Sequence, residues 1–332
     1  MIVGGAVRVP GDKSLTHRAL LFASLARGTS HVGGALTSLD ARSTARVLRQ
    51  LGTGVSPLRP GLVVTIQGRD RFRRPPERLN CGNSGTTTRL LLGLLAAHPF
   101  SAILTGDASL RRRPMRRVTQ PLGRMGARFS ERAGGDGLPL EVRGARLVTL
   151  RYELPVSSAQ IKSAILLAGL AGRVEVALRE PHGRSRDHTE RLLRAFGYRV
   201  EECDGWIEFA PTGRLEPFAM QVPGDPSSAA FLVGAAVLAE SGELRIAEVG
   251  LNPTRIGFLD VLRRMGARVR MENQETRFDE PVGDLVVTPT SLSSTEVSAG
   301  EIPGLIDEIP LLAVLASRAR GTTVFREVGE LR

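Results

Sequence analysis

Basic and hydroxyl side chains gather in one short segment near the N-terminus, V-P-G-D-K-S-L-T-H-R at 9–18. We expect a strand that ends near Pro10, then a turn and a helix with Ser14 as its N-cap. Lys13 then lies where the helix begins, and a cation there opposes the helix dipole unless an anion shares the site. Ser14 and Arg18 are four residues apart and lie on one face of this helix. The segment therefore predicts a phosphate-sized anion site.

The choice of lysine at this site stands out against the composition. Lys13 and Lys162 are the two lysines among 45 basic residues, so the other 43 are arginines. A lysine in such a chain indicates a compact point charge that the bulkier guanidinium does not replace. We interpret Lys13 as a charge between two anionic ligands, and a surface lysine without function is the alternative. For Lys162 neither interpretation is favoured.

Composition limits the partners of this chain. The net charge of +11 fits a polyanion, an acidic small substrate, or an arginine-rich solvated surface. With one tryptophan and two tyrosines to stack on bases, a phosphorylated metabolite is favoured over nucleic acid. Cys81, Cys203 and the five histidines form no metal-ligand spacing, so neither a metal nor a disulfide is expected. The apolar run 229–239 is too short to span a membrane and no signal segment is recognisable, so a cytoplasmic protein is expected.

Two sequence patterns recur along the whole chain. In the first, a helix ends in an apolar residue and a glycine before a strand, at Gly52, Gly126, Gly197 and Gly266. Each glycine is placed to stop a helix in the left-handed backbone conformation. The glycines are 74, 71 and 69 residues apart, which predicts a repeated structural unit.

In the second pattern, apolar helices open with small polar residues. Their starts are expected near Ser14, Ser84, Ser158, Ser227 and Asp307. Because these helices are apolar on most faces, we expect them to be buried inside a shell of strands. The predicted unit is β-α-β-α-β-β, roughly 70 residues long. Parallel helices of this kind would bring their positive ends to one cleft, which favours an anionic ligand.

Six motifs in this order resemble the 5-enolpyruvylshikimate-3-phosphate synthase family, and the similarity runs from residue 2 to Arg332. They are P-G-D-K-S-L-T-H-R at Pro10, N-S-G-T-T-T-R at Asn83, R-R-P-M at Arg112, S-A-Q-I-K-S-A at Ser158, R-D-H-T-E at Arg186 and G-L-I-D-E-I-P at Gly304. The resemblance implies an α/β fold: a two-domain inside-out α/β barrel of βαβαββ units whose buried parallel helices lie within sheets. Residues 11–224 would form a complete three-unit domain, and residues 1–10 plus 225–332 an incomplete second one.

The resemblance also implies an activity. Family members transfer the enolpyruvyl group of phosphoenolpyruvate to the 5-hydroxyl of shikimate 3-phosphate and release phosphate, on the route to chorismate and the aromatic amino acids. The substrates lie between the two domains, and no metal or organic cofactor takes part. We therefore expect a monomeric transferase whose partners are these two small molecules, without nucleic acid or membrane.

Site residues follow from the motifs that match. The shikimate 3-phosphate set implied by the resemblance is Lys13, Ser14, Arg18, Ser158, Ala159, Gln160, Arg186 and Asp307. The phosphoenolpyruvate set is Lys13, Asn83, Gly85, Arg113 and Gln160. Lys13 and Asp307 would be catalytic, with Asp307 as the base that accepts the hydroxyl proton. Gly85 would let a phosphate approach the helix backbone closely. A complete version of the chain would then be sensitive to glyphosate, which uses the same space.

The sequence departs from the family pattern at its C-terminal end. Family members continue with a Lys-Glu-x-Asp-Arg segment and two further cations that grip phosphoenolpyruvate, whereas this chain ends at Arg332. Since loss of one oriented charge reduces a rate about 10²-fold or more, we expect a poor or inactive catalyst. Exposed apolar surface in the second domain is expected as well.

Three other interpretations stay open at this stage. The first is a non-catalytic fragment that binds shikimate 3-phosphate through the complete domain. The second is a UDP-N-acetylglucosamine enolpyruvyl transferase, although the segment 106–112 lacks the reactive cysteine of that family. The third is a nucleic-acid enzyme similar to RNA 3′-phosphate cyclases, which the positive net charge favours and the scarcity of aromatic residues disfavours.

Overall fold

The computed structural model describes residues 1–132, 134–181 and 183–329, and the chain divides into two compact units. Unit 1 comprises Met1–Asp12, His182–Asp187 and Pro223–Arg332, and unit 2 comprises Lys13–Pro181 and His188–Val222. The division into domains expected from the sequence, 11–224 against 1–10 plus 225–332, stays a prediction, since compactness alone does not define a folding domain.

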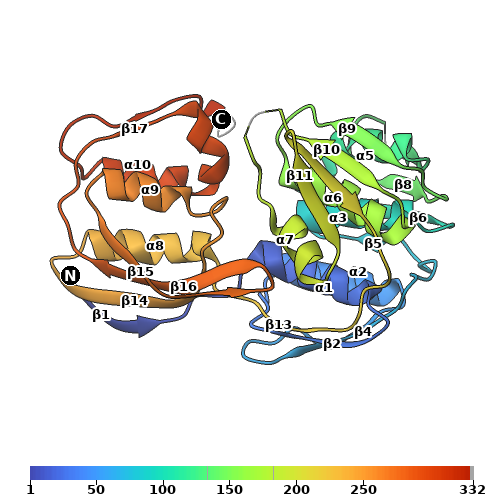
Figure 1. Ribbon diagram of the computed structural model, residues 1–332, viewed down its shortest axis with the longest axis horizontal. Helices are drawn as coiled ribbons and strands as arrows, with labels where there is room; N and C mark the ends of the chain where they lie inside the picture. The colour runs from blue at the N-terminus through green and yellow to red at the C-terminus, as the bar shows by residue number, and fades with distance from the viewer. Residues whose placement is uncertain (133, 182, 330–332) are drawn as a thin grey trace. The chain divides into compact units, whose positions relative to one another are not determined.

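Unit 2 contains three four-stranded sheets within its described residues, each joined to helices (Figure 1). The first group is α1 (Lys13–Leu25), β2 (Gly28–Gly33), α2 (Leu39–Gln50), β3 (Gly54–Val55), β4 (Val64–Gly68) and β13 (Ala219–Gln221). The second is β5 (Leu79–Asn80), α3 (Gly85–Ala96), β6 (Ser101–Thr105), α4 (Ala108–Arg111), α5 (Arg116–Arg124), β7 (Arg128–Glu131) and β8 (Leu140–Arg143). The third is β9 (Leu150–Glu153), α6 (Ala159–Gly172), β10 (Val176–Arg179), α7 (His188–Ala195), β11 (Arg199–Cys203) and β12 (Trp206–Ala210).

Unit 1 is built on one further four-stranded sheet with helices on one side of it. Its elements are β1 (Ile2–Val7), α8 (Pro226–Val237), β14 (Ser241–Gly250), α9 (Gly257–Arg264), β15 (Arg268–Arg277) and β16 (Glu280–Thr288). The segment after them holds β17 (Glu296–Val297), the 3₁₀ turns η1 (Ala299–Gly304) and η2 (Ile306–Glu308), α10 (Ile309–Ala316) and β18 (Val324–Phe325). Strands β17 and β18 pair in parallel as a separate two-stranded sheet.

The four larger sheets share one strand order, which explains the sequence repeat. The orders are β13-β2-β4-β3, β5-β6-β8-β7, β9-β10-β12-β11 and β1-β14-β16-β15. In each, the first two strands are parallel and the other pairs are antiparallel. The first strands of two repeats are exchanged, because β1 pairs with β14 and β13 pairs with β2. The predicted α/β fold of βαβαββ units is confirmed.

The predicted glycine stops are confirmed. Gly52, Gly126, Gly197 and Gly266 have φ of 90°, 112°, 82° and 94°, and each follows the last residue of its helix by two positions. This is the left-handed region that glycine adopts at low energetic cost, so each glycine ends a helix and redirects the chain into the next strand.

The predicted helix starts are only partly correct. Ser84 is the N-cap of α3 and accepts a bond from the Thr87 amide, as expected. Helix α1 already begins at Lys13, so Ser14 is its second residue and not its N-cap. The N-cap of α8 is Asp225, whose carboxylate is a stronger acceptor for the two amides of the first turn.

The predicted burial of the apolar helices holds in unit 2 but not throughout unit 1. Helices α3 and α6 bury most of their residues, mainly against each other and also against β8, β10 and β12. On α8, however, Phe231 is 66% exposed, and on α10 Val314 is 57% exposed. Among the described residues of unit 1, helix α8 packs chiefly against β14, β16, α10 and η2. Apolar surface therefore stays exposed in this unit, as the sequence suggested.

Candidate functional site

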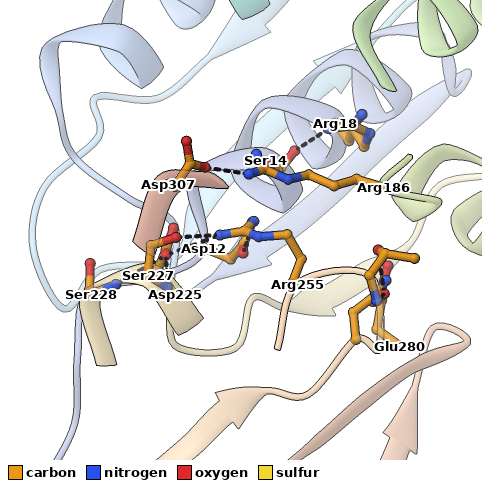
Figure 2. Close-up of polar contacts among 12 residues, drawn as sticks. Asp12, Ser14, Arg18, Arg186, Asp225, Ser227, Ser228, Arg255, Glu280 and Asp307 are labelled. Carbon is orange, nitrogen blue, oxygen red and sulfur yellow. Dashed lines mark hydrogen bonds and ion pairs between the residues drawn. The ribbon is translucent and has the colours of Figure 1, made fainter. Parts of the chain in front are cut away.

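Arg18 lies in the second turn of α1, the first helix of unit 2, and is fixed by hydroxyl groups from two other helices. Its Nε–H donates to Thr189 Oγ1 (2.8 Å) and its Nη2–H to Ser163 Oγ (2.7 Å). Its Nη1–H donates to the Ser14 carbonyl at 3.1 Å, the contact drawn in Figure 2. The side chain is 3% exposed. A guanidinium held in this way is preorganised beside the first turn of α1, where the helix dipole also favours an anion.

The N-terminal turns of α3 and α6 lie side by side. Gln160, the second residue of α6, donates from Nε2 to Thr86 Oγ1 at 3.1 Å, and Arg89 donates from Nη1 to Gln160 Oε1 at 2.5 Å. Ser158 is at the N-cap position of α6 without a capping bond, and both it and Ala159 are half-buried. Together with the link from Arg18 to Ser163, these contacts bring the starts of α1, α3 and α6 to one end of unit 2. The starts of these three helices therefore lie together, whereas the predicted single cleft at the ends of all five helices stays a prediction.

Two arginines flank the first residue of α3, Gly85. A Cβ at Gly85 would lie 3.1 Å from Arg113 Nη1 and 3.3 Å from Arg89 Nη1. Arg113 also donates from Nη2 to Asn83 Oδ1 at 2.9 Å. The amides of Gly85 and Thr86 have no acceptor within the helix, whereas the Thr87 amide donates to Ser84 Oγ, so the first two are available to a ligand between these guanidiniums. The arrangement suits a phosphate or carboxylate group.

Arg89 is the residue of this site to which the sequence assigned no role. Burial lowers the pKa of its guanidinium, and the positive charges of Arg113 and Arg117 lower that pKa further, against the opposing effect of Asp136. Positive charge is thus concentrated around the start of α3, and a bound anion would relieve the repulsion. The sequence did contain an indication that Arg89 belongs to this site, because Arg89 lies four residues after Gly85 on the same helix face.

Lys13 is the first residue of α1, as predicted, and its side chain is exposed. A cation at this position is unfavourable for the helix by itself, because it adds to the positive end of the helix dipole. Its expected place between two ligands stays a prediction.

In unit 1, the two other predicted site residues meet each other. The Arg186 guanidinium forms an ion pair with the carboxylate of Asp307, 121 residues further along the chain (Figure 2). Asp307 lies in η2, directly before α10, and its side chain is 52% exposed. An exposed carboxylate can accept a proton from a bound hydroxyl group, and the adjacent guanidinium can hold an anionic group of the same ligand.

A second cluster of unit 1, centred on Arg255, was not found from the sequence. Its guanidinium contacts the carboxylates of Asp12 (3.1 Å) and Asp225 (3.5 Å) and the hydroxyl of Ser227 (2.8 Å), as Figure 2 shows. Arg255 is 3% exposed. Asp12 and Asp225 are the last residues of two identical V-P-G-D segments, 9–12 and 222–225. This repeat was the feature of the sequence that could have indicated a shared role for the two aspartates. Arg255 therefore fixes the residue that precedes Lys13.

Glu308 follows Asp307 and is buried, and burial raises the pKa of its carboxyl group. A bond from Ser227 and the charge of Arg255 act in the opposite direction. No cluster of three or more His, Cys, Asp or Glu side chains fit to hold a metal ion is found in the described ranges. The described helices also include none that is both long and apolar enough to cross a membrane.

Comparison with known proteins places these features in a family. A family model described as EPSP synthase (3-phosphoshikimate 1-carboxyvinyltransferase) matches residues 2–332. The 3-phosphoshikimate 1-carboxyvinyltransferase of Bacillus licheniformis is 44% identical over 328 residues, which cover 99% of this chain and 76% of that protein. The protein of the same name from Geobacter sp. strain M21 is 47% identical over 332 residues, covering 99% of this chain and 77% of the relative.

Solved structures agree with this match. An EPSP synthase from Acinetobacter baumannii superposes with a TM-score of 0.90 at 40% identity, covering 100% of this chain and 75% of that chain. The enolpyruvyl transferase NikO from Streptomyces tendae, at 20% identity and a TM-score of 0.76, shares the fold. These matches do not favour the aminosugar transferase or the nucleic-acid enzyme as an interpretation. The chain belongs to the EPSP synthase family.

Proposed function

We propose that this protein transfers the enolpyruvyl group of phosphoenolpyruvate to the 5-hydroxyl of shikimate 3-phosphate, giving 5-enolpyruvylshikimate 3-phosphate and phosphate. Relatives at 44–47% identity carry the name of this activity. The observation that carries the proposal is the meeting of three helix starts with buried or half-buried arginines in unit 2. Such a site fits substrates that each bear a phosphate and a carboxylate.

Shikimate 3-phosphate is the substrate that we assign to the starts of α1 and α6. Arg18 is already fixed by Ser163 and Thr189, so it can bind an anion without losing further side-chain freedom. Gln160 offers a polar group for ring hydroxyls. The full proposed set is Lys13, Ser14, Arg18, Ser158, Ala159, Gln160, Arg186 and Asp307.

Phosphoenolpyruvate is assigned to the start of α3. Arg113 and Arg89 lie on both sides of the open position above Gly85, where two forked guanidiniums can take a phosphate and a carboxylate. Arg89 is added here to the set predicted from the sequence, which is Lys13, Asn83, Gly85, Arg113 and Gln160. Lys13 is proposed to contact both substrates as a point charge.

The proposed chemical step uses the carboxylate of Asp307. It accepts the proton of the 5-hydroxyl as that oxygen forms a bond to C2 of phosphoenolpyruvate, and the electron pair of the C=C bond takes up a proton at C3, which becomes a methyl group. In the second step the bond between C2 and the phosphate oxygen breaks, the methyl group gives up a proton to restore the C=C bond, and phosphate leaves. Arg186 holds Asp307 in position and neutralises part of the negative charge that gathers there.

The test is a titration followed by a turnover assay. Calorimetric titration of the purified chain with shikimate 3-phosphate, alone and with phosphoenolpyruvate, measures binding. Phosphate release and mass spectrometry of 5-enolpyruvylshikimate 3-phosphate measure the reaction. Binding together with product supports the proposal. Binding without product supports the alternative of a non-catalytic binding protein, and absence of both refutes the proposal.

Two variants separate the catalytic role of Asp307 from general damage. Asp307→Asn should lower kcat by about 10²–10⁴-fold, because an amide cannot accept the hydroxyl proton. Asp260→Asn removes an exposed carboxylate of α9 that pairs with Arg263, and should leave kcat unchanged. Equal kcat values for the two variants would exclude Asp307 as the base.

Monomeric state and cytoplasmic location are part of the same proposal. They rest on the sequence and on the biosynthetic activity proposed here. Light scattering on the purified protein tests the first, and fractionation of the cells that produce it tests the second. A mass twice the 35.7 kDa of the chain would replace the monomer by a dimer.

A further inference from the structure

The second lysine of the chain, Lys162, is buried in unit 2 between two carboxylates. Its Nζ lies 2.9 Å from Glu180 Oε2 and 2.7 Å from Glu190 Oε1. The side chains of the three residues are 1%, 5% and 2% exposed, respectively. Burial by itself would lower the pKa of Lys162, but the charges of Glu190 and Glu180 raise it above its usual value. The lysine therefore stays protonated, and its charge serves these two partners.

The two glutamates stand on either side of one connection. Glu180 follows Arg179, the last residue of β10, and Glu190 lies in the first turn of α7. The chain between them includes His182–Asp187, which is grouped with unit 1 although both of its neighbours belong to unit 2. Arg186 lies in this connection. Through its two ion pairs, Lys162 thus ties both ends of the segment that contains Arg186 to helix α6.

The neighbouring residues form a second link between the same two helices. Ser163, next to Lys162, and Thr189, next to Glu190, both accept bonds from Arg18, and Thr189 Oγ1 donates to Ser163 Oγ at 2.7 Å. The ion triad and this hydroxyl pair therefore hold α6 and α7 together directly behind a candidate substrate cation.

One ammonium group suits this position because two carboxylates converge on one atom. Lysine offers three donors on a compact charge, whereas the planar arginine fork would need partners spread over a wider plane. Without the ammonium, two carboxylates would remain buried close together and repel each other. The ends of the connection would then separate, or one carboxylate would take up a proton.

We propose that Lys162 is a positioning residue, which holds the ends of the 181–187 connection so that Arg186 is correctly placed to bind the phosphate of shikimate 3-phosphate. This inference rests on the function proposed above and goes beyond it, because Lys162 belongs to neither proposed substrate set and is buried against Glu180 and Glu190. It accounts for the second lysine of an arginine-rich chain. The proposal also predicts that Lys162 acts on substrate binding through Arg186. A role of Lys162 in stability alone would not predict this.

The first experiment measures the connection itself and needs no substrate. Limited digestion with trypsin should cut after Arg184 and Arg186 about tenfold faster in Lys162→Met than in the parent protein, because local opening exposes these bonds. Cleavage in the exposed run 111–113 serves as the internal reference and should not change. Arg151→Met, which breaks the exposed pair of Arg151 with Glu208, is the matched control and should digest like the parent. Equal cleavage in Lys162→Met and the parent would overturn the proposal.

The second experiment is a double-mutant cycle on the calorimetric Kd for shikimate 3-phosphate. Lys162→Met and Arg186→Gln should each weaken binding about tenfold or more. If Lys162 acts through Arg186, adding Lys162→Met to Arg186→Gln should change Kd by less than about twofold. Multiplicative effects would overturn the proposal. A parent protein that does not bind shikimate 3-phosphate would refute the proposed function, and the digestion would still decide whether Lys162 holds the connection.

A third variant separates positioning from stability. Lys162→Met combined with Glu180→Gln and Glu190→Gln removes the two buried negative charges together with the ammonium, so the urea midpoint should return towards that of the parent. Binding of shikimate 3-phosphate should stay weak, since the connection still lacks its clamp. If affinity returns together with stability, the role of Lys162 is structural only and the positioning role is refuted.

Discussion

Replacing Arg255 by methionine is expected to destabilise unit 1 by about 3–5 kcal/mol. The guanidinium of Arg255 contacts Asp12, Asp225 and Ser227, and the two aspartate side chains are 2% and 11% exposed. Methionine fills most of the volume but leaves both carboxylates without their shared cation. The expected loss is therefore the free energy of burying uncompensated charge and not that of an empty cavity.

Urea denaturation followed by circular dichroism measures this loss. For a slope of about 3 kcal/mol/M, a loss of 4 kcal/mol lowers the midpoint by about 1 M or more. Arg263→Met is the matched control, because Arg263 pairs with Asp260 at 3.0 Å on the exposed face of α9. An exposed pair contributes about 0.2–1 kcal/mol, so the control midpoint should shift by about 0.3 M at most.

A double variant tests the cause. If the loss comes from the broken ion pair between Arg255 and the Asp12 carboxylate, then Asp12→Asn should restore part of the stability of Arg255→Met, although Asp12→Asn alone is destabilising. A coupling of the expected sign supports the argument. A loss below about 1 kcal/mol in Arg255→Met, or losses that simply add, would show that Arg255 fills space and compensates no charge.

Three further predictions concern single residues. Gly85→Ala should raise the KM for phosphoenolpyruvate about three- to tenfold, because the added Cβ pushes on two arginines. The Kd for shikimate 3-phosphate should stay within about twofold. The control is Gly123→Ala, whose Cβ meets nothing within 4 Å. At about pH 8 a thiol reagent should modify one cysteine per native chain, the exposed Cys203, and two cysteines after denaturation. The reason is that Cys81 is buried and that burial raises the pKa of its thiol to about 11. Two rapidly reacting thiols in the native protein would contradict this prediction. Gly197→Ala should lower the free energy of unfolding by about 1–2 kcal/mol in urea denaturation, because alanine is strained at a φ of 82°. The added Cβ would have no contact within 4 Å, so the loss reports backbone strain and not a clash. An unchanged midpoint would exclude strain at this helix end.

Features that depend on a few adjacent residues could be read from the sequence. The four glycine stops, the cap at Ser84 and the β-α-β-α-β-β order followed from local backbone preferences and from the spacing of repeats. A helix start close to Lys13 was also predicted, but not the exact first residue. Ser14 was taken as the N-cap because a hydroxyl is a good acceptor, which would make Leu15 the first helical residue, whereas the helix begins at Lys13, two residues earlier. Local propensity fixes such boundaries only to within a residue or two.

Tertiary structure decided which distant residues meet. The repeats themselves do not distinguish which sheet takes β1 and which takes β13; the family resemblance implied that residues 1–10 belong with 225–332, and the structure gives the strand partners β14 and β2. The pairing of Lys162 with Glu180 and Glu190, of Arg255 with Asp12, and of Arg186 with Asp307 joins residues that are 18 to 243 positions apart. The sequence alone determined the family motifs and the repeated unit, because both lie in contiguous segments. Long-range charge partners needed the structure, because in a chain with 43 arginines charge complementarity allows many pairings, and packing selects among them.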